Sequence, residues 1–456
     1  MPTGSWAANG TSRTRPTLDL HIRHTPIPVV HTMPPTVRPG CDVHTDTCGL
    51  VLSTSEDRQY PARCRISDRR LNNFESRWTG IIHMGDFQER IQTVRCEHPE
   101  AEVWRHLGLL ATPSYAETAL RKLFKDSLGS RLMADKLDGF AKCMLQAREY
   151  FYASRSVTAA TAPTLCYYGM VSLCAAVAIF KSRDLTLRST PKAHGLTPED
   201  LTPCTNVLDA ACRVDSSGMF PLIGTLNVAD YCTYERWLPV SDDYIPVGPA
   251  HFAVAVRHGD SRVTEVTAKR LVLSDLLSRL PDIGFEAWTH PETSLAVLDC
   301  TVSVERMNDR EVTSARLRAS CEDSGQVERL TQMMSTSYPS WQQAAVGQEV
   351  YEYEIKNVAN PFADPCPPLR DSVSGKTFIA LPGSRGTPVM PEMCDWLGAG
   401  FLTGTLARYY PQVWLGKPRA RPETALLTER FLEAAPRRFP NLVLNALYGR
   451  LFRFIT

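Results

Sequence analysis

The sequence lacks the short motifs of several common enzyme classes. It contains no G-x-x-x-x-G-K-[ST] phosphate loop, no H-E-x-x-H zinc motif and no G-x-S-x-G nucleophile elbow. Each motif supplies a group that its class requires: backbone N–H groups around phosphates, a pair of zinc-binding imidazoles, or a serine exposed on a sharp turn. The chain is therefore not expected to be a standard P-loop NTPase, a zincin or an α/β-hydrolase, and no motif implies a bound cofactor.

An excess of charge of either sign is also lacking. Fifty Lys and Arg residues against 49 Asp and Glu residues give a formal net charge of +1. Such a balance does not attract nucleic acid or an anionic membrane over the whole surface, so any such partner must be recruited locally. The segment 417–456, with eight basic and three acidic residues, is the locally basic part. A solvated helical face explains it, and an RNA-facing surface is the alternative.

The 14 cysteines are scattered, and no two of them form a Cys-x-x-Cys pair. The first residues do not show the basic and then apolar pattern of a secretory leader. We therefore expect reduced thiols in a cytoplasm. Cys41, His44, Cys48 and Cys64 are zinc-ligand types, but their spacing is not that of tight zinc-binding pairs. We interpret this cluster as incidental and expect no metal site.

Long hydrophobic runs are nearly absent as well. Residues 157–180 contain no charged side chain over a length that could cross a bilayer. Threonines dilute the run and Pro163 interrupts it early, so we expect a buried core helix and no membrane partner.

The order of sequence patterns predicts an α+β fold with an N-terminal helical part, a central mostly antiparallel sheet and C-terminal helices. Residues 1–100, rich in Pro, Thr and Arg at their start, are expected to be a largely disordered extension. The remainder, 101–456, divides into a helical part (101–200), a strand-rich part (201–385) and a second helical part (386–456).

Apolar residues at steps of three and four predict the helices. The clearest helix begins near Arg131, and its core face contains Met133, Leu137, Phe140, Met144, Ala147 and Phe151. A second helix is expected over 164–181, with Pro163 in its first turn. Ser114 and Glu117 suggest a capping box, and a stripe of Leu444, Leu447, Leu451 and Phe454 suggests a last helix.

Alternation with period two predicts strands in the central part. Residues 252–270 are expected to form two strands about a turn, and 271–280 a short helix. Further strands are expected over 295–304, 315–321, 351–355 and 377–381, and the loop LPGSRGTP after the last of these is interpreted as a turn. Charged residues on alternate positions indicate a sheet with one solvated face.

Five sequence blocks carry a family resemblance. They are QAREYFYAS (146–154), APTLCYYGMVSL (162–173), HGL (194–196), GMFPLIG (218–224) and FLTGTLARYYPQVW (401–414). In order and spacing they resemble the landmarks of the YaaC-like bacterial protein family, from about Val103 to the C-terminus. The resemblance implies a fold and an intracellular location, but the family is largely uncharacterised and implies little chemistry.

A second resemblance suggests a reaction. Two helices followed by Arg-x5-His, here Arg188 and His194, resemble the higher eukaryote and prokaryote nucleotide-binding domains, many of which cleave RNA without a metal. A histidine can move protons at the 2′-hydroxyl while an arginine stabilises charge on the phosphate. The same spacing occurs at three other places in the chain. Because of Pro191 and Gly195, we do not expect one continuous helix through both residues. The alternative is that His194 packs a turn and Arg188 is solvated.

Aromatic residues next to arginine form the candidate ligand-binding residues Tyr167, Tyr168, Arg408, Tyr409 and Tyr410. Such groups can stack on bases and hold phosphates, although packing explains them too. Two functions remain open. One is a cytoplasmic protein that binds a protein partner or a nucleotide without catalysis. The other is a metal-independent ribonuclease in stress or anti-phage defence, using Arg188 and His194 and doubled by homodimerisation.

Overall fold

The computed structural model describes the residues 91–226, 230–236, 250–256, 269–283, 296–307, 312–321, 323–347, 349–358, 362, 366–417, 419 and 421–456. The chain divides into two units, Met1–Arg63 and Cys64–Thr456, and every described residue belongs to the second. The cysteine and histidine cluster at 41–64 and the expected N-terminal extension up to residue 90 lie outside the described residues.

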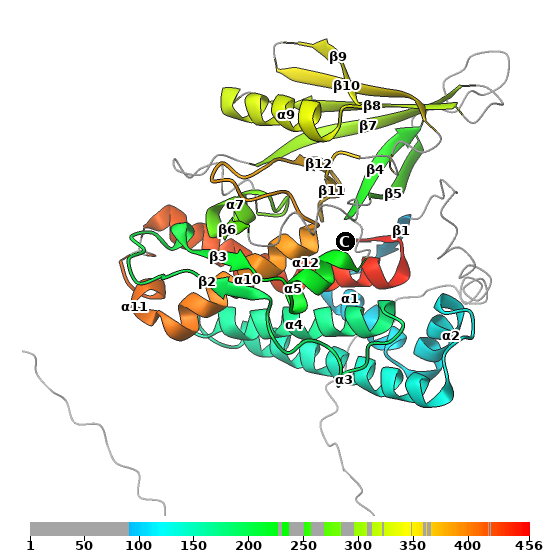
Figure 1. Ribbon diagram of the computed structural model, residues 1–456, viewed down its shortest axis with the longest axis vertical. Helices are drawn as coiled ribbons and strands as arrows, with labels where there is room; N and C mark the ends of the chain where they lie inside the picture. The colour runs from blue at the N-terminus through cyan, green and yellow to red at the C-terminus, as the bar shows by residue number, and fades with distance from the viewer. Residues whose placement is uncertain are drawn as a thin grey trace, which may run out of the picture. The chain divides into compact units, whose positions relative to one another are not determined.

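Helices form most of one half of the described structure (Figure 1). They are α1 (Pro99–Leu110), α2 (Pro113–Leu123), α3 (Ser130–Arg155), α4 (Ala162–Lys181), α5 (Met219–Thr225), α7 (Leu273–Ser278), α10 (Glu392–Tyr409), α11 (Pro411–Trp414) and α12 (Pro422–Tyr448). A three-stranded sheet of β2 (Leu196–Pro198), β3 (Ala211–Val214) and β6 (Arg270–Val272) packs with them. The terminal strands β1 (Ile91–Arg95) and β13 (Leu451–Ile455) pair in parallel.

An eight-stranded sheet forms the other half. Its strands are β4 (Asp230–Arg236), β5 (Ala250–Val256), β7 (Val297–Met307), β8 (Val312–Ser320), β9 (Gln342–Val346), β10 (Val350–Val358), β11 (Leu369–Asp371) and β12 (Thr377–Ala380). The main order is β11-β12-β7-β8-β10-β9, antiparallel throughout, and β4 pairs with β5 and in parallel with β7. Helix α9 (Ser324–Ser337) lies across one face (Figure 1). The α+β prediction is confirmed.

Two separate hydrophobic cores underlie this arrangement. The larger one lies among the helices, and the second lies between the eight-stranded sheet and α9. The sheet strands occupy positions in the sequence between α5 and α10, but β6 and α7 return to the helical core between β5 and β7. The chain therefore passes between the two cores four times.

Helix α4 lies within the larger core. It is long and apolar enough to cross a membrane by length and composition, yet 78% of its most apolar window is buried in the protein. Pro163 stands in its first turn, as predicted. Helix α3 packs along it with the predicted face: Met133, Phe140, Met144, Ala147 and Phe151 are buried and Leu137 is partly buried against the same core.

Two details of the predicted helices were wrong. Thr112, not Ser114, precedes the first turn of α2, because Pro113 begins the helix, and no side chain caps it. The stripe from Leu444 to Phe454 is not one helix: Gly449 adopts a left-handed φ of 64° that ends α12, and Leu451 and Phe454 belong to β13. The second helical part therefore ends in a strand.

A buried ionic network joins the two cores. The carboxylate of Asp395, in the first turn of α10, accepts hydrogen bonds from Arg279 Nη2 at 2.5 Å and from Arg370 Nη2 at 2.7 Å. All three side chains are 0% exposed. Nearby, Arg438 of α12 donates two hydrogen bonds to the carboxylate of Glu392. Such charges are tolerated in an interior only when they are paired and hydrogen-bonded.

A buried lysine holds the C-terminal end of α4. Lys136 Nζ of α3 donates to the carbonyl oxygens of Ile179 (2.6 Å), Ser182 (2.5 Å) and Leu185 (2.9 Å). The last carbonyls of a helix lack partners within the helix, and a cation there also interacts favourably with the helix dipole. Lys136 therefore fixes the point where the chain leaves α4 toward His194.

Candidate functional site

Glycines on α4 and α10 allow these helices to approach their neighbours closely. A Cβ atom at Gly169 of α4 would lie 2.9 Å from the ring of Phe151 of α3. One at Gly400 of α10 would lie 2.7 Å from Met170 Sδ, and one at Gly404 would lie 3.3 Å from Tyr167 Cβ. Any larger side chain at Gly169 or Gly400 would push these helices apart. The blocks 146–154, 162–173 and 401–414 are thus packed together around α4.

The other two blocks meet backbone to backbone beside α10. Gly195 and Gly218 have φ angles of +77° and +124°, and a Cβ at Gly218 would lie 2.4 Å from Gly195 Cα. The N–H groups of Met219 and Phe220 donate to the carbonyl oxygens of Ala193 and His194, each at 2.9 Å. Because the start of α5 holds both carbonyls, the backbone of His194 is fixed in place.

The side chain of His194 lies among aromatic rings. Its ring centroid is 5.3 Å from that of Tyr167 and 5.8 Å from that of Phe401, and these two rings are 5.7 Å apart. Tyr168 continues the group toward α3, since its ring lies 5.8 Å from that of Tyr150. All five landmark blocks contribute to or contact this aromatic cluster, which we define as Tyr150, Tyr167, Tyr168, His194, Phe401, Arg408 and Tyr409.

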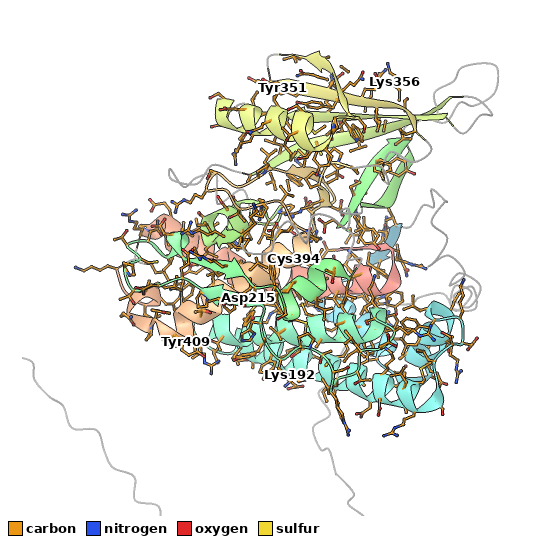
Figure 2. All side chains as sticks on the ribbon, viewed as in Figure 1. Lys192, Asp215, Tyr351, Lys356, Cys394 and Tyr409 are labelled. Carbon is orange, nitrogen blue, oxygen red and sulfur yellow. The ribbon has the colours of Figure 1, made fainter. Side chains whose placement is uncertain are left out.

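Arg408 provides the charge of the aromatic cluster. Its Nη1 donates to the hydroxyl of Tyr168 at 2.5 Å, and its guanidinium lies 4.8 Å from the centroid of the Tyr409 ring. No carboxylate pairs with Arg408 among the residues that the structure describes. Tyr409 is 61% exposed, and Figure 2 labels it at the end of α10, close to α11. An exposed ring with a cation over it is a surface on which a planar ligand can stack.

Burial and charge shift the pKa values of Tyr167 and His194, the two titratable rings at the centre of the aromatic cluster. Burial raises the pKa of the Tyr167 hydroxyl well above its ordinary value. Burial, and then the positive charge of Arg408, lower the pKa of His194 below its ordinary value. In the described part of the chain neither ring nitrogen of His194 has a hydrogen-bond partner. His194 is therefore a neutral imidazole near physiological pH, able to donate one hydrogen bond and to accept another.

No hydrogen bond, ion pair or ring contact among the described residues joins the side chains of the remaining candidates, Arg188 and Tyr410, to this cluster. Arg188 is exposed in a turn at 186–189, and within the described residues no hydrogen bond or ion pair connects it with His194. The segment from Ser182 to Gly195 is not helical, as Pro191 and Gly195 suggested. Tyr410 is half-buried and packs against the helical core. The cation whose charge acts on His194 is Arg408, more than 200 residues away in the sequence.

Two features were not predicted. The ionic network of Asp395 and its partners was missed, although Glu392 and Asp395 are the two acidic residues of a mostly apolar helix and could have indicated it. The loop LPGSRGTP is the predicted turn after β12, but it also surrounds a carboxylate. Asp275 accepts hydrogen bonds from the N–H groups of Arg385 and Thr387 and from the Ser384 hydroxyl. The protein's own carboxylate thus occupies this group of donors.

Other types of site are not found in the described regions. No group of three or more His, Cys, Asp or Glu residues there could hold a metal ion. A small pocket between α1, α12 and β13 is lined by Arg437, Arg438 and Arg453, but has space for little more than one water molecule, about 20 Å³. Arg438 and Arg453 there already bind Glu392 and Asp371. The aromatic cluster is therefore the candidate functional site.

Comparison with known proteins agrees with the landmark blocks. The family model described as YaaC-like Protein matches residues 110–447, which is most of the chain. Searches among curated proteins and among solved structures gave no match. The matched range contains all five blocks and every residue of the aromatic cluster, and the chain belongs to the YaaC-like family.

Proposed function

We propose that this chain is a nucleotide-binding protein and that the aromatic cluster is its ligand site. The observation that carries the proposal is the position of Arg408, a cation that has no carboxylate partner among the described residues and is held over the exposed ring of Tyr409 by its bond to Tyr168. A nucleotide has the two complementary parts, a planar base that stacks on an aromatic ring and a phosphate that binds a guanidinium.

The location proposed for this function is the cytoplasm. The structure shows no disulfide among the eleven cysteines that it describes. Burial raises the pKa of several of their thiols, including Cys166, Cys174 and Cys212, so these are unreactive packing residues. Many cysteines with no disulfide among those described fit a reducing compartment, where nucleotides are also abundant.

The test is calorimetric titration of the folded protein with AMP, ATP and a short single-stranded RNA. Replacing Tyr409 by Ala removes the stacking ring, and we expect binding to weaken by about 1–3 kcal/mol, roughly 5- to 150-fold. A matched control is available on α3, where Arg148 lies 5.3 Å from the ring centroid of Tyr152, a residue 47% exposed. Tyr152→Ala removes the same kind of pair outside the aromatic cluster, and its binding should match the wild type. Equal loss in both variants would contradict the proposed site.

A second candidate function is metal-independent RNA cleavage. It is favoured by the neutral state of His194 beside a fixed positive charge. His194 would accept the 2′-hydroxyl proton as the 2′-oxygen attacks the adjacent phosphorus, and the bond from phosphorus to the 5′-oxygen would break. The leaving oxygen would take a proton from water, giving a 2′,3′-cyclic phosphate and a 5′-hydroxyl. Arg408 would stabilise the phosphate charge, the role that the sequence suggested for Arg188.

Incubation with total RNA and tRNA in EDTA separates the two functions. Cleavage by the wild type, lost in His194→Ala and Arg408→Gln but retained in Arg188→Ala, would favour the ribonuclease with Arg408 as its cation. Loss in Arg188→Ala instead would restore the pair expected from the sequence. Binding of RNA without cleavage would leave the nucleotide-binding function.

A further inference from the structure

The aromatic cluster has one permanent charge and one that depends on a proton. Arg408 stays protonated at any pH of interest, whereas His194 gains its charge only by taking up a proton. Both groups lie on the same aromatic framework, since Tyr168 holds Arg408 and the adjacent residue Tyr167 contacts His194. Part of each side chain is accessible to solvent. The site can therefore carry either one or two positive charges.

Among the described residues, no carboxylate forms an ion pair with His194. The nearest one along the backbone contacts is Asp215, whose N–H donates to the carbonyl oxygen of Gly195 and whose carboxylate accepts from the Thr197 hydroxyl. Tyr167 of α4 and Phe401 of α10 contact its ring, and α5 begins with the apolar Met219 and Phe220. Arg408 is the charged group that acts on it from α10. On its own segment Lys192 donates to the carbonyl oxygen of Leu187. His194 therefore takes up a proton, and the site gains its second positive charge, only when a bound ligand brings negative charge to it.

The identity of the ligand's phosphate, proposed next, rests on the nucleotide-binding function proposed above. We propose that the ligand carries a terminal phosphate monoester bound between Arg408 and His194, and that its binding takes up one proton. A phosphodiester has a single negative charge, which Arg408 alone balances. A phosphate monoester has a charge of about −1.5 to −2 near pH 7, and its second charge favours the imidazolium form of His194. The monoester can belong to a mononucleotide or to a phosphorylated RNA end.

The experiment is to measure affinity as a function of pH for four probes: adenosine, AMP, the dinucleotide diester ApA and a short RNA with a 3′-phosphate. The range is about pH 8.5 to 6.5, above the second pKa of phosphate, which is about 6. Affinity for AMP should rise as pH falls, approaching tenfold per pH unit, the limit for uptake of one proton. Adenosine and ApA should show little change. A similar pH dependence for the RNA, with tighter binding than AMP, would support the inference and identify RNA ends as the source.

Variants test the residues. His194→Gln keeps a hydrogen-bonding side chain but cannot take up the proton, so the pH dependence should vanish while binding at high pH persists. Arg408→Gln should reduce AMP affinity to that of adenosine, and Arg148→Gln should behave as wild type. Circular dichroism confirms that each variant is folded. Binding of AMP without a pH dependence, or a pH dependence that survives in His194→Gln, would overturn the inference but leave nucleotide binding intact. Absence of binding by any nucleotide would refute both proposals.

Discussion

Replacement of Asp395 by Asn tests whether the ionic network holds the two cores together. The Asp395 carboxylate accepts two hydrogen bonds, one from Arg279 and one from Arg370, in a region with no access to solvent. A hydrogen bond to a charged group contributes about 1.5–3 kcal/mol. The asparagine amide keeps one acceptor oxygen, so one bond is lost, the other loses its charge, and the amide NH2 faces an arginine. Arg279 retains the carbonyl oxygens of Thr387 and Pro388, which lowers the expected loss. We expect about 3–5 kcal/mol, as found when one partner of a buried pair is removed.

The measurement is urea-induced unfolding followed by fluorescence and circular dichroism, comparing wild type and Asp395→Asn. Glu117→Gln is the control, because the ion pair of Glu117 with Arg121 on α2 is 2.7 Å long but has both side chains at least 40% exposed. An exposed pair of this kind contributes about 0–1 kcal/mol. If Asp395→Asn were destabilised no more than Glu117→Gln, the network would not be a determinant of stability and the reasoning would be refuted.

Three further predictions concern stability. Lys136→Met should destabilise the protein by about 1–3 kcal/mol, because carbonyls at the end of α4 lose their buried donor. Burial lowers the pKa of Lys136 to about 8. Between about pH 8 and the ordinary lysine pKa of about 10.4, the unfolded chain holds a proton that the folded chain has released. The free energy of unfolding contributed by Lys136 therefore rises with pH in this window. Lys136→Met should lack that rise in urea titrations at several pH values. Gly195→Ala should destabilise the protein by more than about 2 kcal/mol, because its Cβ would lie 2.4 Å from Pro221 Cδ and its φ is positive. Gly108→Ala, on an open helix surface, should stabilise the protein by about 0.5–1 kcal/mol. Equal effects of the two substitutions in thermal unfolding would contradict this prediction. Lys125→Gly should stabilise by about 1 kcal/mol, because Lys125 has a φ of 50° after α2, and an unchanged urea midpoint would show that this turn is unstrained.

Local pattern was enough to predict much of the fold. The spacing of apolar residues from Met133 to Phe151 placed α3 and its buried face, and alternation placed β8 and β10, because both signals arise from the geometry of a single element. The end of α12 was missed because one glycine in a left-handed conformation outweighed a continuing apolar pattern. The order of the strands could not be predicted, since pairing such as that of β12 with β7 depends on contacts over about 80 residues of sequence.

The candidate site shows the same limit. Tyr167, Tyr168, His194, Arg408 and Tyr409 were each identified from residue type and local context, and the structure brings them together. What the sequence could not show is which arginine lies with His194. Spacing along the chain favoured Arg188, six residues away, whereas packing of α10 on α4 supplies Arg408. Tyr150 and Phe401 were within landmark blocks but carried no separate signal, because an aromatic residue on a helix usually packs in the core.

The repeated passage of the chain between the two cores has a consequence for synthesis. Helix α4 packs on α10 and α12, and about 210 residues separate its end at Lys181 from the start of α10 at Glu392. At roughly 5–20 residues per second, the ribosome needs on the order of 10–40 s to supply that partner. During this time a helix apolar enough to resemble a membrane span has, of the helices that contact it, only α3 and the short α5 to cover it. The nascent chain is therefore a strong candidate substrate for chaperones that bind exposed apolar segments, and truncation anywhere before α10 should yield an aggregating fragment and not a smaller folded protein.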